Sequence, residues 1–288
     1  MVGTLVAASA DALSVRRRDG SVVEVAVDDV TAGRVVPPGP AATISAGDLQ
    51  AVMAQGWRAI ETADCGGWLL RAGGGFTGRA NSALVPPDPV ADLPAQLAQV
   101  RHWYDERGLP AKLQVVIGHE PPGLVEALEE SGWTTAWRTH AMTAELGHVL
   151  RAASAAPAAT VHLHPRPDES WLAAYRNDEG PLSPVAAQII GNHPDVVFAS
   201  VREEDRCLAV ARVAVDGRWA GLSCVEVDDV HRRRGLAQAV TTAAMRWAVD
   251  RGARRTYLQV VTSNEPATAL WERLGYRYHH DYVYWNAP

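Results

Sequence analysis

Several residue types are scarce in this chain of 288 residues, and each scarcity excludes a class of protein. The only cysteines, Cys65, Cys207 and Cys224, are far apart and lack the spacing of metal ligands. We therefore expect reduced thiols, no disulfide framework and no metal site. No apolar run approaches the roughly 18 residues of a membrane span, and the N-terminus lacks the basic and apolar segments of an export signal. These absences predict a cytoplasmic protein.

Lysine is almost missing as well, since Lys112 is the only lysine among 27 basic residues. Together with the abundance of alanine, this bias is typical of GC-rich coding. The formal net charge of −6 argues against a generally basic nucleic-acid binder. Hydrophobic residues make up 47% and charged residues 21%, which is ordinary for a globular chain of two compact domains or three small ones.

The first 40 residues predict a small β domain. Alternation of apolar and polar residues predicts four short strands, and Asp19-Gly20 is typical of a hairpin turn. The predicted strands are Gly3–Ala8, Ala12–Arg17, Ser21–Val27 and Gly33–Val36. Four such strands make an incomplete barrel, so either the natural start lies upstream of Met1 or a later segment completes the sheet. The proline-rich run Pro37–Pro40 predicts a stiff linker.

Two longer segments, 45–150 and 155–288, share an order of predicted elements. In the first, a helix follows Ser45, and Gly67–Arg71 and Arg79–Leu84 predict a hairpin around a Gly-rich turn. Five short stretches recur in the second segment in the same order. Trp103, Arg107-Gly108, Leu113–Val116, Glu120-Pro121 and Gly132-Trp133 correspond to Trp247, Arg251-Gly252, Leu258–Val261, Glu265-Pro266 and Gly275-Tyr276. We infer a duplicated fold.

The most informative stretch is a short basic loop between a predicted strand and a predicted helix. Small residues there let backbone N–H groups approach a ligand, and the helix N-terminus adds a partial positive charge. The loop therefore predicts an anion site suited to a pyrophosphate, whereas the alternative is a solvated basic turn. The residues of this loop are Arg232, Arg233, Arg234, Gly235, Leu236 and Ala237.

The pattern Arg-x-x-Gly-x-Ala, which begins at Arg232, resembles the cofactor loop of the GNAT superfamily of N-acetyltransferases. The later stretch from Asn264 to Tyr276, with Ala267, Leu270, Trp271 and Leu274, resembles the second signature of that superfamily. The resemblance is strong over 155–288 and weak over 45–146. The whole chain also resembles actinobacterial proteins with an SH3-like N-terminal domain and a C-terminal GNAT domain, some of which are described as histone-type lysine acetyltransferases.

The resemblance implies an α/β (α+β) fold of tandem GNAT-like lobes, with mixed, mostly antiparallel sheets flanked by helices, after a small SH3-like β-barrel. It implies three domains: an SH3-like domain over 1–40, a degenerate GNAT-like lobe over 45–150 and a catalytic lobe over 155–288. Acetyl-CoA, as cosubstrate, would lie between the strands Trp219–Val227 and Thr256–Val261. The loop would hold its pyrophosphate, and the backbones of Val225 and Val227 and the side chains of Asn264 and Trp271 would contact its pantetheine arm.

The catalytic acid and base are less defined by the sequence. Glu226 adjoins the loop and is a candidate base, although it can equally be a plain ion-pair partner. The superfamily usually has tyrosine at the position of Trp271, where it protonates the leaving thiolate, and tryptophan has no acidic proton near neutral pH. Either the thiolate leaves unassisted or another group serves. We expect Tyr276, with Tyr282 and Tyr284 as alternatives, and His231, His279 and His280 as possible helpers or plain exposed histidines.

The first lobe departs from the superfamily pattern. In place of the loop it has Pro86-Pro87-Asp88-Pro89, and prolines remove the N–H donors that a phosphate needs. We therefore expect this lobe to bind no coenzyme A and to shape the acceptor site instead. The run Gly73–Gly75 is interpreted as a hairpin tip, since no helix follows it.

The acceptor is expected to be an amine, and three functions stay open. In the first, the acceptor is a protein lysine, and the N-terminal domain recruits a protein or nucleoid target, with Arg16–Arg18 either at phosphates or at a solvated edge. In the second, the acceptor is a small-molecule amine in a cleft between the lobes. In the third, the chain is a non-catalytic acetyl-CoA-binding protein, as Trp271 would allow.

Overall fold

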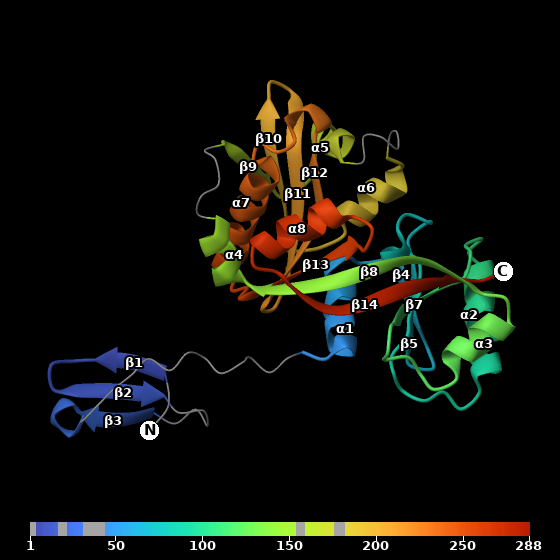
Figure 1. Ribbon diagram of the computed structural model, residues 1–288, viewed down its shortest axis with the longest axis horizontal. Coiled ribbons are helices and arrows are strands. Elements are labelled where there is room, and N and C mark those ends of the chain that lie inside the picture. The colour runs from blue at the N-terminus through green and yellow to red at the C-terminus, as the bar shows by residue number, and fades with distance from the viewer. Residues whose placement is uncertain (1–3, 17–21, 31–43, 154–158, 176–181) are drawn as a thin grey trace. The chain divides into compact units, whose positions relative to one another are not determined.

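The computed structural model describes residues 4–16, 22–30, 44–153, 159–175 and 182–288, which belong to two units, Met1–Thr43 and Ile44–Pro288 (Figure 1). In the first unit β1 (Thr4–Ala8), β2 (Ala12–Arg16) and β3 (Val22–Ala26) form an antiparallel sheet in that order. Three predicted strands are thus confirmed. The fourth predicted strand, the Asp19-Gly20 turn and the proline-rich linker lie outside the described residues, and the SH3-like barrel stays a prediction.

In the second unit one mixed sheet of 11 strands carries the strands of both predicted lobes, in the order β4-β5-β6-β7-β14-β8-β13-β12-β11-β10-β9. The strands from the first half are β4 (Glu61–Cys65), β5 (Trp68–Ala72), β6 (Ala83–Leu84), β7 (Lys112–Val116) and β8 (Thr134–Glu145). Those from the second half are β9 (Val161–His164), β10 (Val196–Glu203), β11 (Arg206–Asp216), β12 (Trp219–Val227), β13 (Arg255–Val261) and β14 (Arg277–Asn286). A boundary between lobes near residue 150 stays a prediction.

Most of the helices begin at a side-chain cap that the sequence shows. The oxygens of Ser45, Asp168, Ser183 and Asn264 each accept a hydrogen bond from a backbone N–H of the first turn. The helices are α1 (Ala46–Gly56), α2 (Leu93–Asp105), α3 (Leu124–Glu130), α4 (Leu146–Ala152), α5 (Glu169–Ala174), α6 (Pro184–Gly191), α7 (Leu236–Asp250) and α8 (Glu265–Arg273).

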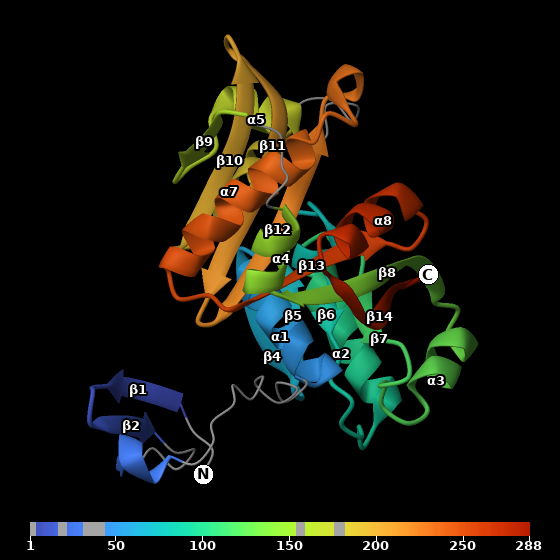
Figure 2. The same cartoon turned by 60° about the vertical axis from the view of Figure 1, so that its left-hand side comes forward.

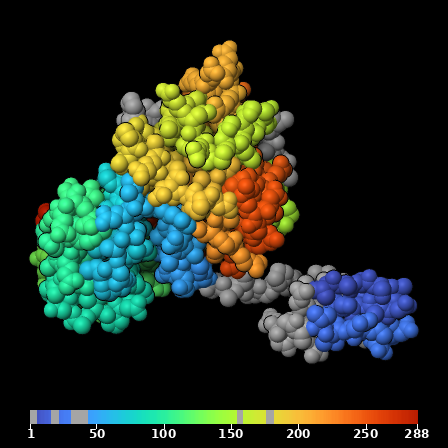
Figure 3. Space-filling view, turned by 180° about the vertical axis from the view of Figure 1, so that it is seen from behind, coloured from blue at the N-terminus to red at the C-terminus, as the bar shows by residue number. Residues whose placement is uncertain are grey.

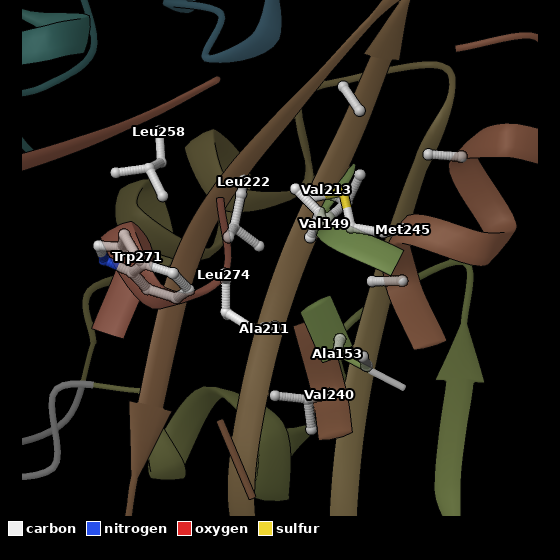
Figure 4. Packing of buried hydrophobic residues seen from close by; sticks show 14 of the residues in the cluster. Val149, Ala153, Ala211, Val213, Leu222, Val240, Met245, Leu258, Trp271 and Leu274 are labelled. Carbon is white, nitrogen blue, oxygen red and sulfur yellow. The ribbon is translucent and has the colours of Figure 1, made fainter. Parts of the chain in front are cut away.

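The second half of the sheet is covered on both faces. Along β10, Val197 and Ala199 pack in the cluster of α4, α7 and α8, whereas Val196 and Phe198 pack in that of α5 and α6. Figure 2 shows α7 in front of β10 and β11, and Figure 4 shows Trp271 of α8 near Leu222 of β12 within the first cluster. The cores of the two faces are therefore separated by the sheet.

The C-terminal strands of the two halves change places. β8, from the first half, pairs with β13 of the second half, and β14, at the end of the chain, pairs with β7 of the first half. β8 and β14 also pair with each other in antiparallel fashion. In the view from behind, α1 lies in blue between the cyan surface of the first half and the orange surface of the second (Figure 3). Each half thus completes its sheet with a strand of the other.

The hairpin predicted for the first half is confirmed only in part, and two elements were missed. The main hairpin partner of β5 is β4, which the sequence analysis missed, whereas Arg79–Leu84 forms a short 3-10 helix and then β6, which pairs with β5 only at Leu69 and Leu84. The reason is that β4 is an edge strand with mostly polar, exposed residues, so it lacks an alternating apolar pattern. Helix α4 was also missed.

Candidate active site

The two central strands β12 and β13 fork in the middle of the sheet. They pair in parallel only from Trp219 with Arg255 to Gly221 with Tyr257, and no further pairing follows. The buried Tyr257 side chain lies at the fork, where its hydroxyl fills the space that a Cβ at Gly221 would occupy. Glycine at this position therefore lets the ring stand between the strands. Beyond the fork, the facing edges of β12 and β13 are open to a ligand.

A β-bulge lies just beyond the fork. Residues Cys224 and Val225 of β12 both lie opposite Ala211 of β11, because the register shifts between Ser223 and Glu226. Cys224 has a positive φ of 54°, which is uncommon for a residue other than glycine. Such bulges change the direction of side chains and backbone groups, and they occur often beside active sites.

A cleft of about 480 Å³ opens at the fork. Its walls come from β12 and β13, from α8 and from the segment around Arg79 of the first half. Four predicted site residues line this cleft, and so do the two tyrosines that were named as alternatives to Tyr276. The predicted site residues are Val225, Glu226, Asn264 and Trp271, and the tyrosines are Tyr282 and Tyr284.

The predicted anion loop lies between the end of β12 and the start of α7. A 3-10 helix, Asp229–His231, follows the strand, and then Arg233 and Gly235 adopt positive φ angles of 62° and 78°. The first hydrogen bond of α7 runs from the N–H of Ala239 to the carbonyl of Gly235. The N–H groups of Leu236 to Gln238 therefore precede the helical hydrogen bonds and are available to an anion.

The three arginines of the loop differ in their contacts. Arg232 pairs with Asp229 at 2.6 Å and lies 3.7 Å from Glu226. Arg233 and Arg234 are exposed and have no ion pair with any residue in the described ranges. Glu226 thus has the ion-pair contact that the sequence analysis gave as the alternative, and it also lines the cleft. Both interpretations of Glu226 fit its position.

The predicted acid Tyr276 does not reach the cleft. Its side chain is buried, its hydroxyl is 3.0 Å from the Thr256 hydroxyl, and its ring contacts Trp271 edge-on. By contrast, the rings of Tyr282 and Tyr284 line the cleft, and Tyr282 donates a 2.5 Å hydrogen bond to Gln259. Burial raises the pKa of all three phenols. The cleft tyrosines therefore keep their protons at neutral pH.

The predicted helper histidines lie elsewhere. His231 contacts the carboxylate of Asp228 at 3.1 Å, and His279 and His280 contact each other at 2.8 Å within a buried chain of hydrogen bonds. None of the three is among the described residues that line the cleft. The alternative of plain exposed histidines is also wrong, because His280 is buried and His231 and His279 are partly buried.

The sequence analysis missed a cluster of arginines around Trp57. The guanidinium of Arg79 lies 4.2 Å from the centre of the Trp57 ring, and that of Arg212 lies 5.0 Å from it. Arg212 is buried, and it donates to the carbonyls of Ile190 and Gly56. No local pattern could have revealed this cluster, because its members come from three distant segments.

An acidic hollow of about 690 Å³ adjoins the cleft on the face of α5. Glu226 lines both spaces. The hollow is lined by five acidic residues, Asp168, Glu169, Asp205, Glu226 and Asp228, and by two basic ones, Arg202 and Arg206. This surface would attract a cation such as a protonated amine.

The first half has lost the anion-binding features at the equivalent place. Pro86 and Pro87 follow one residue after β6, and Asp92 caps α2 by accepting a hydrogen bond from the N–H of Ala95 at 3.0 Å. The carboxylate of Asp92 thus stands where an anion would bind. Among the described residues no group of His, Cys, Asp and Glu could hold a metal ion. No helix in the described ranges has the length and apolar character needed to cross a membrane.

Comparison with known proteins agrees with this architecture. Residues 43–285 match a family described as "Probable histone acetyltransferase Rv0428c C-terminal". The probable histone acetyltransferase Rv0428c of Mycobacterium tuberculosis is 32% identical over 286 residues, which cover 97% of this chain and 86% of the relative. The uncharacterized N-acetyltransferase YobR of Bacillus subtilis is 28% identical over 236 residues, which cover 79% of this chain and 93% of YobR.

Solved structures show the same fold. A GCN5-related N-acetyltransferase from Kribbella flavida has a TM-score of 0.61 at 21% identity, over 84% of this chain and 95% of its own. A tandem GNAT protein from the clavulanic acid biosynthesis pathway has a TM-score of 0.57 at 15% identity, over 90% and 91% of the two chains. The forked sheet and these likenesses define a GNAT N-acetyltransferase. Within that class, the chain belongs to the family of the Rv0428c C-terminal region.

Proposed function

We propose that the chain is an acetyl-CoA-dependent enzyme that transfers the acetyl group to the amine of an acceptor. The observation that carries this proposal is the fork of β12 and β13 beside the open N-terminus of α7. The loop from Arg232 to Ala237 would bind the pyrophosphate through backbone N–H groups and arginines, and the open edge of β12 at Val225 and Val227 would bind the pantetheine arm. Asn264 and Trp271 line the same path.

Bound acetyl-CoA would supply a thioester carbonyl for attack by the amine. The acceptor ammonium must first lose a proton, and Glu226 is the carboxylate at the boundary of cleft and acidic hollow that can accept it, directly or through a water. The C–N bond then forms, the C–S bond breaks, and the thiolate takes up a proton. Of the tyrosines that line the cleft, we propose Tyr282 and Tyr284 as the donors, whereas Tyr276 lies in the core.

The remaining domains receive roles in the same proposal. We assign catalysis to 155–288 and propose that 45–150 is a lobe without coenzyme A that contributes to the acceptor end, as Arg79 in the cleft suggests. A small SH3-like domain over 1–40 would recruit a macromolecular target if the acceptor is a protein lysine. That acceptor is suggested by the name of the M. tuberculosis relative. A small-molecule amine is the second candidate, and the charged interior of the cleft favours it.

The test is calorimetric titration of acetyl-CoA into the full chain and into Gly235→Glu. The new carboxylate would stand at the anion loop, so we expect one-site binding by the wild type and none by the variant. The matched control is Gly252→Glu, because Gly252 also has a positive φ, 88°, but lies after the C-terminal end of α7.

Loss of binding in Gly235→Glu together with normal binding in Gly252→Glu would support the loop as the site. Equal binding by all three proteins, or no binding by the wild type, would refute the proposal. Release of free thiol with any amine then separates the enzyme from a non-catalytic acetyl-CoA-binding protein, which would bind acetyl-CoA without thiol release.

A further inference from the structure

Among the described residues, one cationic side chain lines the cleft, and this residue, Arg79, comes from the first half of the chain. Among the described residues that line the cleft, only Arg79 and Glu226 are charged. Both lie on the face of the sheet that carries α5 and α6, since Arg79 stacks on Trp57 of that cluster and Glu226 faces the α5 hollow. The anion loop, where the pyrophosphate of the cofactor is proposed to bind, lies beyond Glu226 at the end of β12. Arg79 and Glu226 are therefore on the side of the cleft that is left for the acceptor.

Arg79 is held in position without an acidic partner. Its guanidinium stacks on Trp57, whose indole N–H donates a 3.0 Å hydrogen bond to the Thr77 hydroxyl. The groups that act on its charge are the phenols of Tyr175, Tyr282 and Tyr284 and the thiol of Cys224, and all four line the cleft with it. Within the described ranges it has neither a hydrogen bond nor an ion pair, so its planar set of N–H donors is open toward the cleft.

The neighbouring arginine makes this charge more unusual. Arg212 also lies over the Trp57 ring, is 1% exposed, and has one terminal nitrogen, Nη2, that is buried without a partner among the described residues. Arg79 and Arg212 line the same small space beside Trp57, and of the two only Arg79 also lines the cleft. Buried charges are costly unless they are paired, so this arrangement favours a negative group of a ligand.

The position of Arg79 limits where that negative group can lie on the acceptor. Its neighbour Cys224 is the bulge residue at the fork, next to the place where the amine must attack. The acceptor amine, in turn, must reach Glu226, which is two residues further along the same strand. An anionic group that contacts Arg79 is therefore close to the reacting amine, as a carboxylate is in an amino acid.

We propose that the acceptor is a small zwitterionic amine of the amino-acid type, whose carboxylate binds Arg79 while its amine faces Glu226. This inference rests on the proposed function and names its substrate class. A planar guanidinium matches a carboxylate in a bidentate manner, which lysine cannot do. The side chain of a protein lysine has no carboxylate near its amine and would leave Arg79 without a partner.

The experiment compares carboxylates with matched amides. A panel of free L-amino acids and ω-amino acids is assayed for acetyl-CoA-dependent thiol release beside the corresponding amino amides and a lysine-containing peptide. We expect kcat/KM to be at least about 10-fold higher for the best carboxylate than for its amide. Arg79→Gln should lower kcat/KM for that carboxylate by about 10- to 100-fold, should leave the amide unchanged, and should be partly rescued in Arg79→Lys.

The matched control is Arg101→Gln, because Arg101 also comes from the first half and lies over a tryptophan, Trp133, at 5.9 Å, but it does not line the cleft. It should behave as the wild type with every acceptor. Equal turnover of acids and amides would overturn the inference. A uniform loss with all acceptors in Arg79→Gln would also overturn it, because Arg79 would then act on the transfer step itself.

A binding measurement separates this inference from the proposed function. The N-acetylated form of the best amino acid, or of each panel member if none turns over, is titrated by calorimetry beside its N-acetylated amide. Preference for the carboxylate that is lost in Arg79→Gln supports the inference even if acetyl-CoA does not bind and the proposed function fails. Normal acetyl-CoA binding without any carboxylate preference refutes the inference and leaves the proposed function intact.

Discussion

Replacing His280 with glutamine should remove a large part of the acid sensitivity of this fold. His280 is 5% exposed and lies in a chain of hydrogen bonds whose donor-to-acceptor direction is set by an arginine. Arg71 donates to the oxygen of Gln114 at 2.8 Å, the amide of Gln114 donates to the oxygen of Gln50 at 2.5 Å, and the amide of Gln50 faces Nε2 of His280 at 2.9 Å. Arginine has only donors, so Nε2 must accept, and His280 must be neutral.

The magnitude follows from the pKa. Burial, with smaller contributions from His279 and His119 and against the opposing effect of Asp281, lowers the pKa of His280 from 6.5 to about 4. The unfolded chain therefore binds a proton in a pH range where the folded chain does not. Stability from this group is complete above the unfolded pKa and falls as the pH drops from there toward the folded pKa. Between pH 7.5 and pH 5 the loss is about 2 kcal/mol.

The assay is thermal unfolding of the full chain at pH 7.5 and pH 5. For a unit of this size, the calculated loss of stability corresponds to a decrease of about 4–8 °C in Tm between pH 7.5 and pH 5. The decrease in Tm of His280→Gln should be smaller than that of the wild type by this amount. The control is His102→Gln, because the His102 side chain is 76% exposed. An identical decrease in the wild type and in His280→Gln would refute the assignment of a neutral, buried imidazole.

Two further predictions concern the site and the fork. Tyr284→Phe should lower kcat by about 10- to 100-fold if Tyr284 donates the proton to the thiolate. Tyr276→Phe should leave kcat unchanged and lose only the hydrogen bond to Thr256, which lowers the free energy of unfolding by about 1 kcal/mol. Steady-state kinetics with denaturant titration separates the two, and a kcat loss confined to Tyr276→Phe would reverse our assignment. Gly221→Ala should destabilise by about 1–3 kcal/mol in denaturant titration, because the methyl group overlaps the Tyr257 hydroxyl; an unchanged midpoint would contradict the packing at the fork.

Features that depend on neighbouring residues could be predicted from the sequence. A cap residue such as Ser45 has its effect within one helical turn, so the start of its helix could be located from the sequence. The anion loop, Arg232 to Ala237, has its backbone N–H groups and its positive φ angles within one short segment. These parts follow from local chemistry, and the structure contains them as the sequence indicated.

Features that depend on distant residues could not be predicted. Arg79 and Cys224 are neighbours in the cleft only because the two halves share a sheet, and nothing in the periodicity of either segment records that pairing. The core position of Tyr276 has the same origin, since a tyrosine at the end of a helix can turn toward a cleft or toward the core. The exchange of β8 and β14 lay equally outside the reach of local patterns.

That exchange has a consequence for biosynthesis. The strand that completes the sheet beside Lys112–Val116 is Arg277–Asn286, which is synthesised long after the first half of the chain. Until then the nascent first half has an unpaired strand edge, which is the kind of surface that invites wrong partners. The two halves therefore mature together only after β14 has left the ribosome, and a fault in that strand damages the first half of the polypeptide as well as the second.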